Sequence, residues 1–126
     1  MAIKMFHDSA CTQEVTAANP DLLRQAVESG EDLTEDREFW LRSDDNTLTY
    51  ENITITASGD SNSPTTGEVD IKYSLNNENY EDEISLPNSD FSDPVKIWRR
   101  VHSPNVTFAF NVTTIAHKIT AEEYLK

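Results

Sequence analysis

The sequence predicts a mainly β protein, an antiparallel sandwich of two sheets. From residue 37 onward, apolar and polar residues alternate in short segments, which is the period of a strand with one buried face. Polar stretches rich in Asn, Asp, Ser, Gly and Pro separate these segments, and such residues make turns. Six or seven such segments in a chain of 126 residues are typical of two packed sheets.

Residues 1–34 are predicted to form an N-terminal arm in front of the sandwich, because they lack the sustained alternation that follows. The arm begins with a short apolar piece formed by Ile3, Met5 and Phe6. We expect these three side chains to be buried against a neighbouring protein and therefore to belong to an interface.

A short helix is the favoured interpretation of residues 19–30. Asn19 is a good N-cap, Pro20 is a good first helical residue and Gly30 is a good helix stop. The competing interpretation is an edge strand that ends in a turn at Gly30. The acidic run at 31–36 is expected to be a solvated loop.

The sandwich itself is predicted over residues 35–119. A change of parity near its end predicts a β-bulge at 113–114, which keeps the apolar side chains on both sides of it facing inward. The tail at 120–126 begins with the spacing of a capping box, so a last helical turn is expected there. The predicted strands run over 37–42, 50–57, 69–75, 80–86, 95–101, 106–112 and 115–119.

The charge balance and the short apolar stretches each exclude one class of partner. The chain has 10 Lys and Arg against 23 Asp and Glu, a formal net charge of −13. Without a basic run it has no means of neutralising phosphates, so we expect no nucleic acid partner. The longest uninterrupted apolar stretch is only a few residues, so no membrane partner is expected either.

The nucleophiles and histidines show no catalytic pattern, and we expect the protein not to be an enzyme. His7 and Cys11 are four residues apart, but two ligands are too few for a zinc site. Ser103 follows His102 without the Gly-x-Ser-x-Gly motif of a nucleophile elbow. His117 lies on inward parity and is best interpreted as a satisfied core or interface histidine.

Calcium is the one ion for which the sequence offers a candidate loop. Residues 60–62 begin like a calcium-binding loop, but Pro64 and Ile71 stand where ligands are required. We therefore expect no cofactor. The alternative is a calcium site that pools carboxylates from several loops, namely those at 44–45, 82–83, 90 and 93.

Three large side chains point outward from the predicted strands. Trp40, Trp98 and Arg100 all lie on outward parity, and protein interfaces are enriched in tryptophan and arginine. An interface is therefore the favoured interpretation of this sheet face. A sugar-binding platform and packing under the N-terminal arm are the alternatives.

Two pairs of stretches resemble a known family. Residues 39–45 lead into 49–55, and residues 94–104, which include Trp98-Arg99-Arg100-Val101, precede 108–115. They resemble the small Ig-like accessory proteins of tailed bacteriophages and archaeal tailed viruses. In that family a strand with an aromatic-Arg-Val run meets a proline-containing turn and a final strand rich in Asn and Thr. The resemblance implies an Ig-like β-sandwich present in many copies on a virion.

Together, these observations predict a virion structural protein, most simply a head-decoration protein that stabilises the capsid. A strongly negative small domain suits the outer surface and is repelled by packaged DNA. The expected partners are the major capsid protein or tail proteins, and further copies of the chain itself. The alternatives are a place in the tail or baseplate, or a surface module that recognises host glycans.

Overall fold

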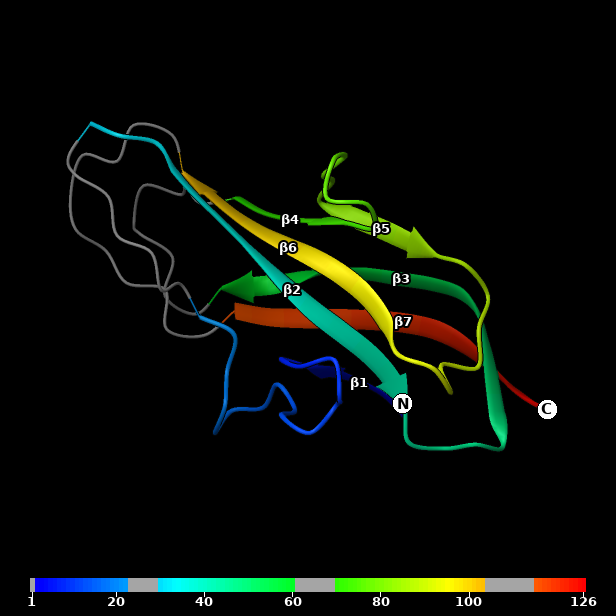
Figure 1. The fold of residues 1–126 in the computed structure, drawn as a ribbon. Coiled ribbons are helices and arrows are strands. Elements are labelled where there is room, and N and C mark those ends of the chain that lie inside the picture. Colours follow the sequence, from blue (N-terminus) through cyan, green and yellow to red (C-terminus); the bar gives the residue numbers. More distant parts are fainter. Residues whose placement is uncertain (1, 23–29, 61–69, 104–114) are drawn as a thin grey trace.

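The computed structural model describes residues 2–22, 30–60, 70–103 and 115–126. These residues form two antiparallel sheets that pack against each other (Figure 1), which confirms the predicted mainly β class. The strand order is β1-β2-β6-β4 in one sheet and β5-β3-β7 in the other. The strands are β1 (Ile3–Phe6), β2 (Leu33–Ser43), β3 (Leu48–Asp60), β4 (Asp70–Ser74), β5 (Glu83–Leu86), β6 (Val95–Ser103) and β7 (Ile115–Leu125).

Three sequence-based expectations fall outside the described residues. They are most of the helix over 19–30, the strand over 106–112 and the bulge at 113–114. In the described part of the first segment, Asp21 forms an isolated antiparallel bridge with Ile115.

The core lies between the two sheets and is built from their inward-facing side chains. Ile53 and Ile55, which alternation places inward, are 0% exposed. Burying one such side chain contributes about 1.5–3 kcal/mol to folding. The same cluster contains Phe39, Leu41, Tyr73 and Ile97 from the four-stranded sheet, and Tyr50, Ile84 and Leu86 from the three-stranded sheet and its flanks.

The N-terminal residues are part of the sandwich, so the prediction of a separate docking arm is wrong. β1 pairs with β2 in antiparallel register, with Ile3 opposite Ser43 and Phe6 opposite Trp40. Ile3 and Met5 are each only 6% exposed, because they pack in the core of this chain. Phe6 points to the other side of β1 and is half-buried.

Two further boundaries differ from the prediction. Most of the acidic run at 31–36 is strand and not loop, because β2 already begins at Leu33, whose side chain is 2% exposed. The tail at 120–126 is not helical, because β7 continues to Leu125 in register with β3. The sandwich therefore extends beyond the predicted 35–119 at both ends.

A bulge in β3 explains how residues of opposite parity share one core. Three steps along β3, from Glu51 to Thr54, correspond to only two steps along β7. Asn52 lies inside this shift with a φ of 51°, a left-handed conformation that asparagine tolerates better than most residues. As a result Tyr50 and Ile53 both face the core. A second shift nearer the end of β3 has the same sense, so β7 itself stays regular.

The placement of β1 predicts that Met5→Ala destabilises the protein by about 2–5 kcal/mol, because the substitution opens a cavity in the core. Lys4→Ala, one residue away on the outer face, is expected to cost about 1 kcal/mol or less, since its ion pairs are solvated. Urea unfolding of both variants measures the difference. Equal midpoints for the two variants would contradict the assignment of β1 to the sandwich.

Candidate functional site

The outer face of the four-stranded sheet carries the aromatic and basic side chains that the sequence singles out. Trp40, Trp98 and Arg100 lie on this face, as their parity predicts, and each is half-buried. We call the surface formed by Trp40, Lys96, Trp98 and Arg100 the Trp face. Across β2 and β6 the paired residues are Trp40 with Lys96, Glu38 with Trp98, and Asp36 with Arg100.

Cations cover the aromatic rings of the Trp face. The Nζ of Lys96 lies 4.7 Å from the ring centroid of Trp98 and 5.8 Å from that of Trp40, within the range of a cation–π contact. The guanidinium carbon of Arg100 lies 3.9 Å from the ring centroid of Tyr80. Arg100 also donates to both carboxylate oxygens of Asp36, at 2.8 and 2.9 Å. These contacts hold the side chains in defined positions before any partner binds.

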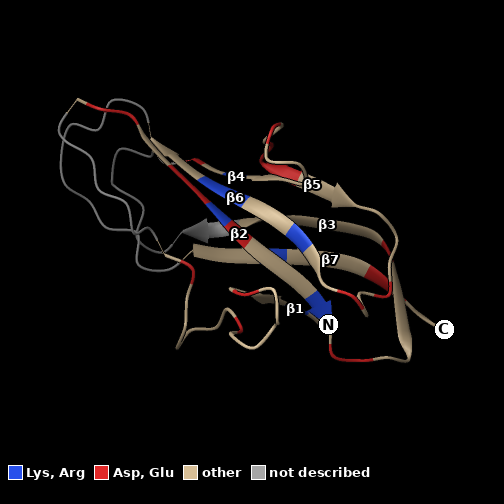
Figure 2. Ribbon diagram, viewed as in Figure 1, with Lys and Arg blue, Asp and Glu red and all other residues tan. Residues whose placement is uncertain are grey.

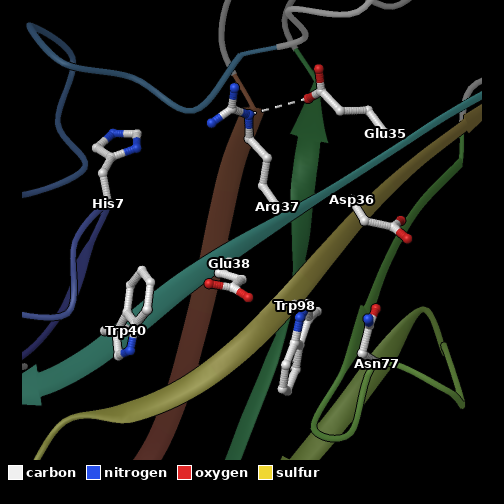
Figure 3. A pocket seen from close by; sticks show the side chains of 8 residues that line it. All are labelled: His7, Glu35, Asp36, Arg37, Glu38, Trp40, Asn77 and Trp98. Carbon is white, nitrogen blue, oxygen red and sulfur yellow. Dashed lines mark ion pairs between the residues drawn. The ribbon is translucent and has the colours of Figure 1, made fainter.

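A shallow hollow of about 680 Å³ lies over this face. Figure 3 shows its lining, in which Trp40 and Trp98 come from neighbouring strands with Glu38 between them. Asp36 and Asn77 lie at the Trp98 side of the hollow. A surface that combines two indoles with carboxylates and an amide is able to bind either a protein side chain or a polar small molecule.

The face concentrates the positive charge of an acidic chain. Figure 2 shows Lys and Arg along β2 and β6, with Asp and Glu beside them on β2 and spread over the connecting segments. The acidic residues of the strands on this face are Asp36, Glu38 and Asp70. Its basic residues are Lys4, Arg42, Lys72, Lys96 and Arg100, half of the Lys and Arg of the chain.

The outer face of the three-stranded sheet has the opposite character. Thr54 and Thr120 face each other across β3 and β7, with their hydroxyl oxygens 2.5 Å apart. Glu51 and Glu122 form the next pair beyond the bulge. Threonine and glutamate are typical of a hydrated sheet face, so the two outer faces of the same sandwich are chemically distinct.

A second cluster of polar residues lies inside the sandwich, around Arg99. Its side chain is 0% exposed and sits among core residues at an inward position of β6. The Nε of Arg99 donates to Asp21 at 2.9 Å, and a terminal nitrogen bonds the other oxygen of the same carboxylate. The remaining terminal nitrogen lies 3.1 Å from the carboxylate of Glu35. Both carboxylates are buried, so the cation is neutralised inside the protein.

The cluster continues from Asp21 to the second sheet. The Nε2 of His117 is 2.8 Å from Asp21, and its Nδ1 is 2.6 Å from the hydroxyl of Tyr73. His117 is therefore a satisfied core histidine, which confirms the sequence-based interpretation. Because Tyr73 comes from β4 and His117 from β7, these hydrogen bonds join the two sheets to each other.

The protonation states of this cluster follow from its contacts. Burial alone would raise the pKa of Asp21, but hydrogen bonds from His117 and Arg99 outweigh burial and hold that pKa below its ordinary value. Burial raises the pKa of Tyr73 far above its usual range. Tyr73 is also 0% exposed, so it is a neutral hydrogen-bonding group that no substrate reaches. The geometry is that of a structural network.

The other residues considered for chemistry have individual contacts that do not join them into one site in the described part of the chain. The Nε2 of His7 lies 3.0 Å from the backbone oxygen of Asn19, and the Nδ1 of His102 lies 3.1 Å from the hydroxyl of Thr34. Cys11 has a free thiol whose pKa is raised, chiefly by burial. Ser103 is buried at the end of β6.

No candidate metal site emerges from the described residues. They contain no group of three or more His, Cys, Asp or Glu able to hold an ion. Residues 61–69, which include most of the sequence-based calcium motif, lie outside them. In the same described part of the chain, no helix has the length and apolar character needed to span a bilayer.

The buried cluster was not predicted from the sequence, although one signal for it was present. Arg99 stands between Ile97 and Val101 on the inward side of a predicted strand, and a cation at such a position requires an anionic partner. The partners themselves, Asp21 and Glu35, carry no local pattern that would identify them.

No protein-family model, curated protein or solved structure matches this chain. The assignment of function therefore depends on the geometry described above and on the residues of the chain.

The buried cluster predicts a large difference between two neighbouring arginines. Arg99→Met removes the guanidinium that the buried carboxylates of Asp21 and Glu35 share and leaves them only His117 and Arg37, so we expect a loss of about 3–5 kcal/mol in the free energy of unfolding. Arg100→Met breaks a partly exposed ion pair and is expected to cost about 1 kcal/mol or less. Guanidinium unfolding of both variants tests this. A small effect at Arg99 would show that the cluster does not stabilise the fold.

The lowered pKa of Asp21 predicts a specific acid dependence. Its stabilising contribution is complete above the ordinary aspartate pKa of 3.8 and is lost as pH falls through the lower pKa of the folded state. We expect Asp21→Asn to be less stable than the unchanged protein at pH 7, and this difference to shrink as pH falls below about 4. Unfolding titrations of both proteins from neutral pH to about pH 2 measure it. A constant difference would contradict the assignment.

Proposed function

We propose that this protein is a non-enzymatic structural protein that docks onto another protein through its Trp face. The assembly it joins is a tailed-virus particle, where the chain acts as a head-decoration protein that stabilises the capsid. The observation that carries the docking proposal is the concentration of two tryptophans and half of the basic residues on one sheet face of a chain of net charge −13.

The contacts on the Trp face support docking in two ways. Tryptophan and arginine are the residues that most often dominate the binding energy of protein interfaces. The cation–π contacts and the bidentate Arg100–Asp36 pair fix their side chains beforehand, which lowers the entropy lost on binding. The opposite sheet face has Thr54, Ser85 and Thr120 at its centre, and its exposed aromatic Tyr124 lies near the end of β7, so the centre supplies no comparable anchor.

The virion as the setting comes from the sequence resemblance to Ig-like accessory proteins of tailed viruses. The sandwich of two antiparallel sheets is compatible with that family, and the acidic surface suits the outside of a particle that contains DNA. The partners proposed are the major capsid protein, or tail proteins in the alternative placement. The docking surface is the Trp face, since Ile3 and Met5 are already buried in the core.

A second candidate function is glycan recognition, favoured by one observation. Trp40 and Trp98 line the same hollow as Asp36, Glu38 and Asn77, a combination that suits stacking and hydrogen bonding to a sugar. Lys96 competes with this function because its ammonium lies over both rings. Binding on a glycan array that Trp98→Ser abolishes would favour this candidate over docking onto protein.

The docking proposal predicts that Trp98→Ser and Lys96→Glu each weaken association with the particle. Loss of a central interface tryptophan typically costs 2 kcal/mol or more, so we expect about a 30-fold or larger loss of affinity. The measurement is the amount of each tagged variant that co-sediments with density-purified virus particles that lack the native chain.

Lys126→Glu is the matched control, because it changes the charge equally at the end of the chain, where Lys126 pairs with Asp90 outside the Trp face. We expect it to bind the particles like the unchanged protein. Thermal unfolding of each variant excludes misfolding as the cause. Absence of the native protein from purified particles, or equal binding of all variants, would overturn the proposal.

A further inference from the structure

Among the described residues, the outer edge of β7 carries no strand partner beyond its first residue. β7 is the last strand of the three-stranded sheet, and only Asp21 pairs with it on the outer side, at Ile115, among the residues that the structure describes. An exposed strand edge offers a row of backbone donors and acceptors to another strand. The edge beyond Ile115 carries neither proline nor a bulge that would block such pairing.

Two backbone hydrogen bonds reveal which groups face outward. The amide of Lys126 donates to Thr47, on the side of β3, at 3.0 Å, whereas the amide of Ile115 donates to Asp21, on the open side, at 2.8 Å. Because β7 is regular, the odd-numbered residues direct their backbone groups to the open edge. Those of Ile119 and Ala121 lie at the centre of this edge.

The side chains of this edge are complementary to themselves in a single register. In an antiparallel pair of two β7 strands centred on Thr120, each Lys118 lies opposite the Glu122 of the other strand. Centring the pair on 118 or 122 instead places like charges opposite each other, and centring it on 119 or 121 leaves Lys118 without an acidic partner. A shift by one residue exchanges the two faces of the strand.

The apolar surface beside the edge fits the same arrangement. A hollow of about 440 Å³ borders the open edge, with Ile3, Val15, Pro20 and Ile119 among its lining residues. At the other end of β7, Leu125 is 80% exposed, the most exposed large apolar side chain among the described residues. In the register centred on Thr120, pairing runs over residues 117–123 and stops before Ile115, whose outer side is taken by Asp21, so Leu125 of one strand ends beside that bridge of the other.

We infer that the open edge of β7 binds the β7 edge of a second copy of this chain. The two strands pair antiparallel about a two-fold axis at Thr120, and the two three-stranded sheets become one continuous sheet. Residues 117, 119, 121 and 123 exchange backbone hydrogen bonds with residues 123, 121, 119 and 117 of the second copy. The Trp face of each copy lies on the other sheet and stays open, so this dimer is independent of the proposed docking.

Charge exchange tests the register. Lys118→Glu and Glu122→Lys are each expected to weaken dimerisation about 10-fold or more, because each puts like charges opposite each other on both sides of the axis. The double variant restores the ion pairs with their signs reversed, and its dimerisation is expected to return to within about 3-fold of the original. Sedimentation equilibrium of the full chain at about 0.15 M salt measures all four proteins.

Glu122→Lys separates the register from general repulsion. It makes the chain two charges less negative than −13, so a dimer limited only by net charge would become stronger. The proposed register predicts that it becomes weaker. Leu125→Ser is expected to weaken the dimer without changing the charge.

Hydrogen exchange followed by NMR locates the interface. The amides of Ile119 and Ala121 are expected to exchange more slowly as chain concentration rises, while that of Thr120, which faces β3, is unaffected. A chain that stays monomeric at millimolar concentration, a double variant that fails to recover, or protection that appears at another edge would each overturn the proposal. All of these measurements use the free chain, so their outcome is separate from that of the particle-binding test.

Discussion

The buried guanidinium of Arg99 is the constraint on which the arrangement of this molecule depends. A cation at an inward position of β6 costs several kcal/mol unless its charge is neutralised and its donors are satisfied. Asp21 and Glu35 meet both requirements, and Asp21 does so from a segment that precedes β2. The same carboxylate binds His117 of β7, and its backbone oxygen accepts from Ile115. One ion pair therefore fixes the N-terminal segment, both sheets and the start of β7.

The alternation of the sequence predicted the central parts of the strands other than β1, and the direction of their side chains. Trp40, Trp98 and Arg100 lie on the outer face because parity within a regular strand is set by the backbone alone. The same reasoning places Arg99 inside, but it does not identify a partner that lies 78 residues away. Contacts of that kind depend on how the two sheets are stacked, and a pattern with a period of two carries no information about stacking.

Two local signals were misleading for physical reasons. The acidic residues around Glu35 resemble a solvated loop, yet one carboxylate serves the buried Arg99 and its neighbour Asp36 serves Arg100 on the outer face. The apolar pair Ile3 and Met5 is too short to reveal an edge strand, because a strand of four residues gains its stability from β2 rather than from its own sequence. In both places a tertiary interaction determines that the segment forms a strand, so local composition alone predicted the wrong kind of structure.

The same distinction between local and global properties applies to association. A net charge of −13 opposes contact between copies, but at physiological salt its field is screened beyond about 8 Å. Inside that distance the neighbouring side chains determine whether two surfaces attract or repel each other, and these side chains differ over the surface of this chain. On the Trp face Lys96 and Arg100 are balanced by Glu38 and Asp36, and Lys118 and Glu122 give the edge of β7 alternating signs. An acidic chain that is repelled as a whole is thus restricted to contacts at those few places where its own charges are balanced.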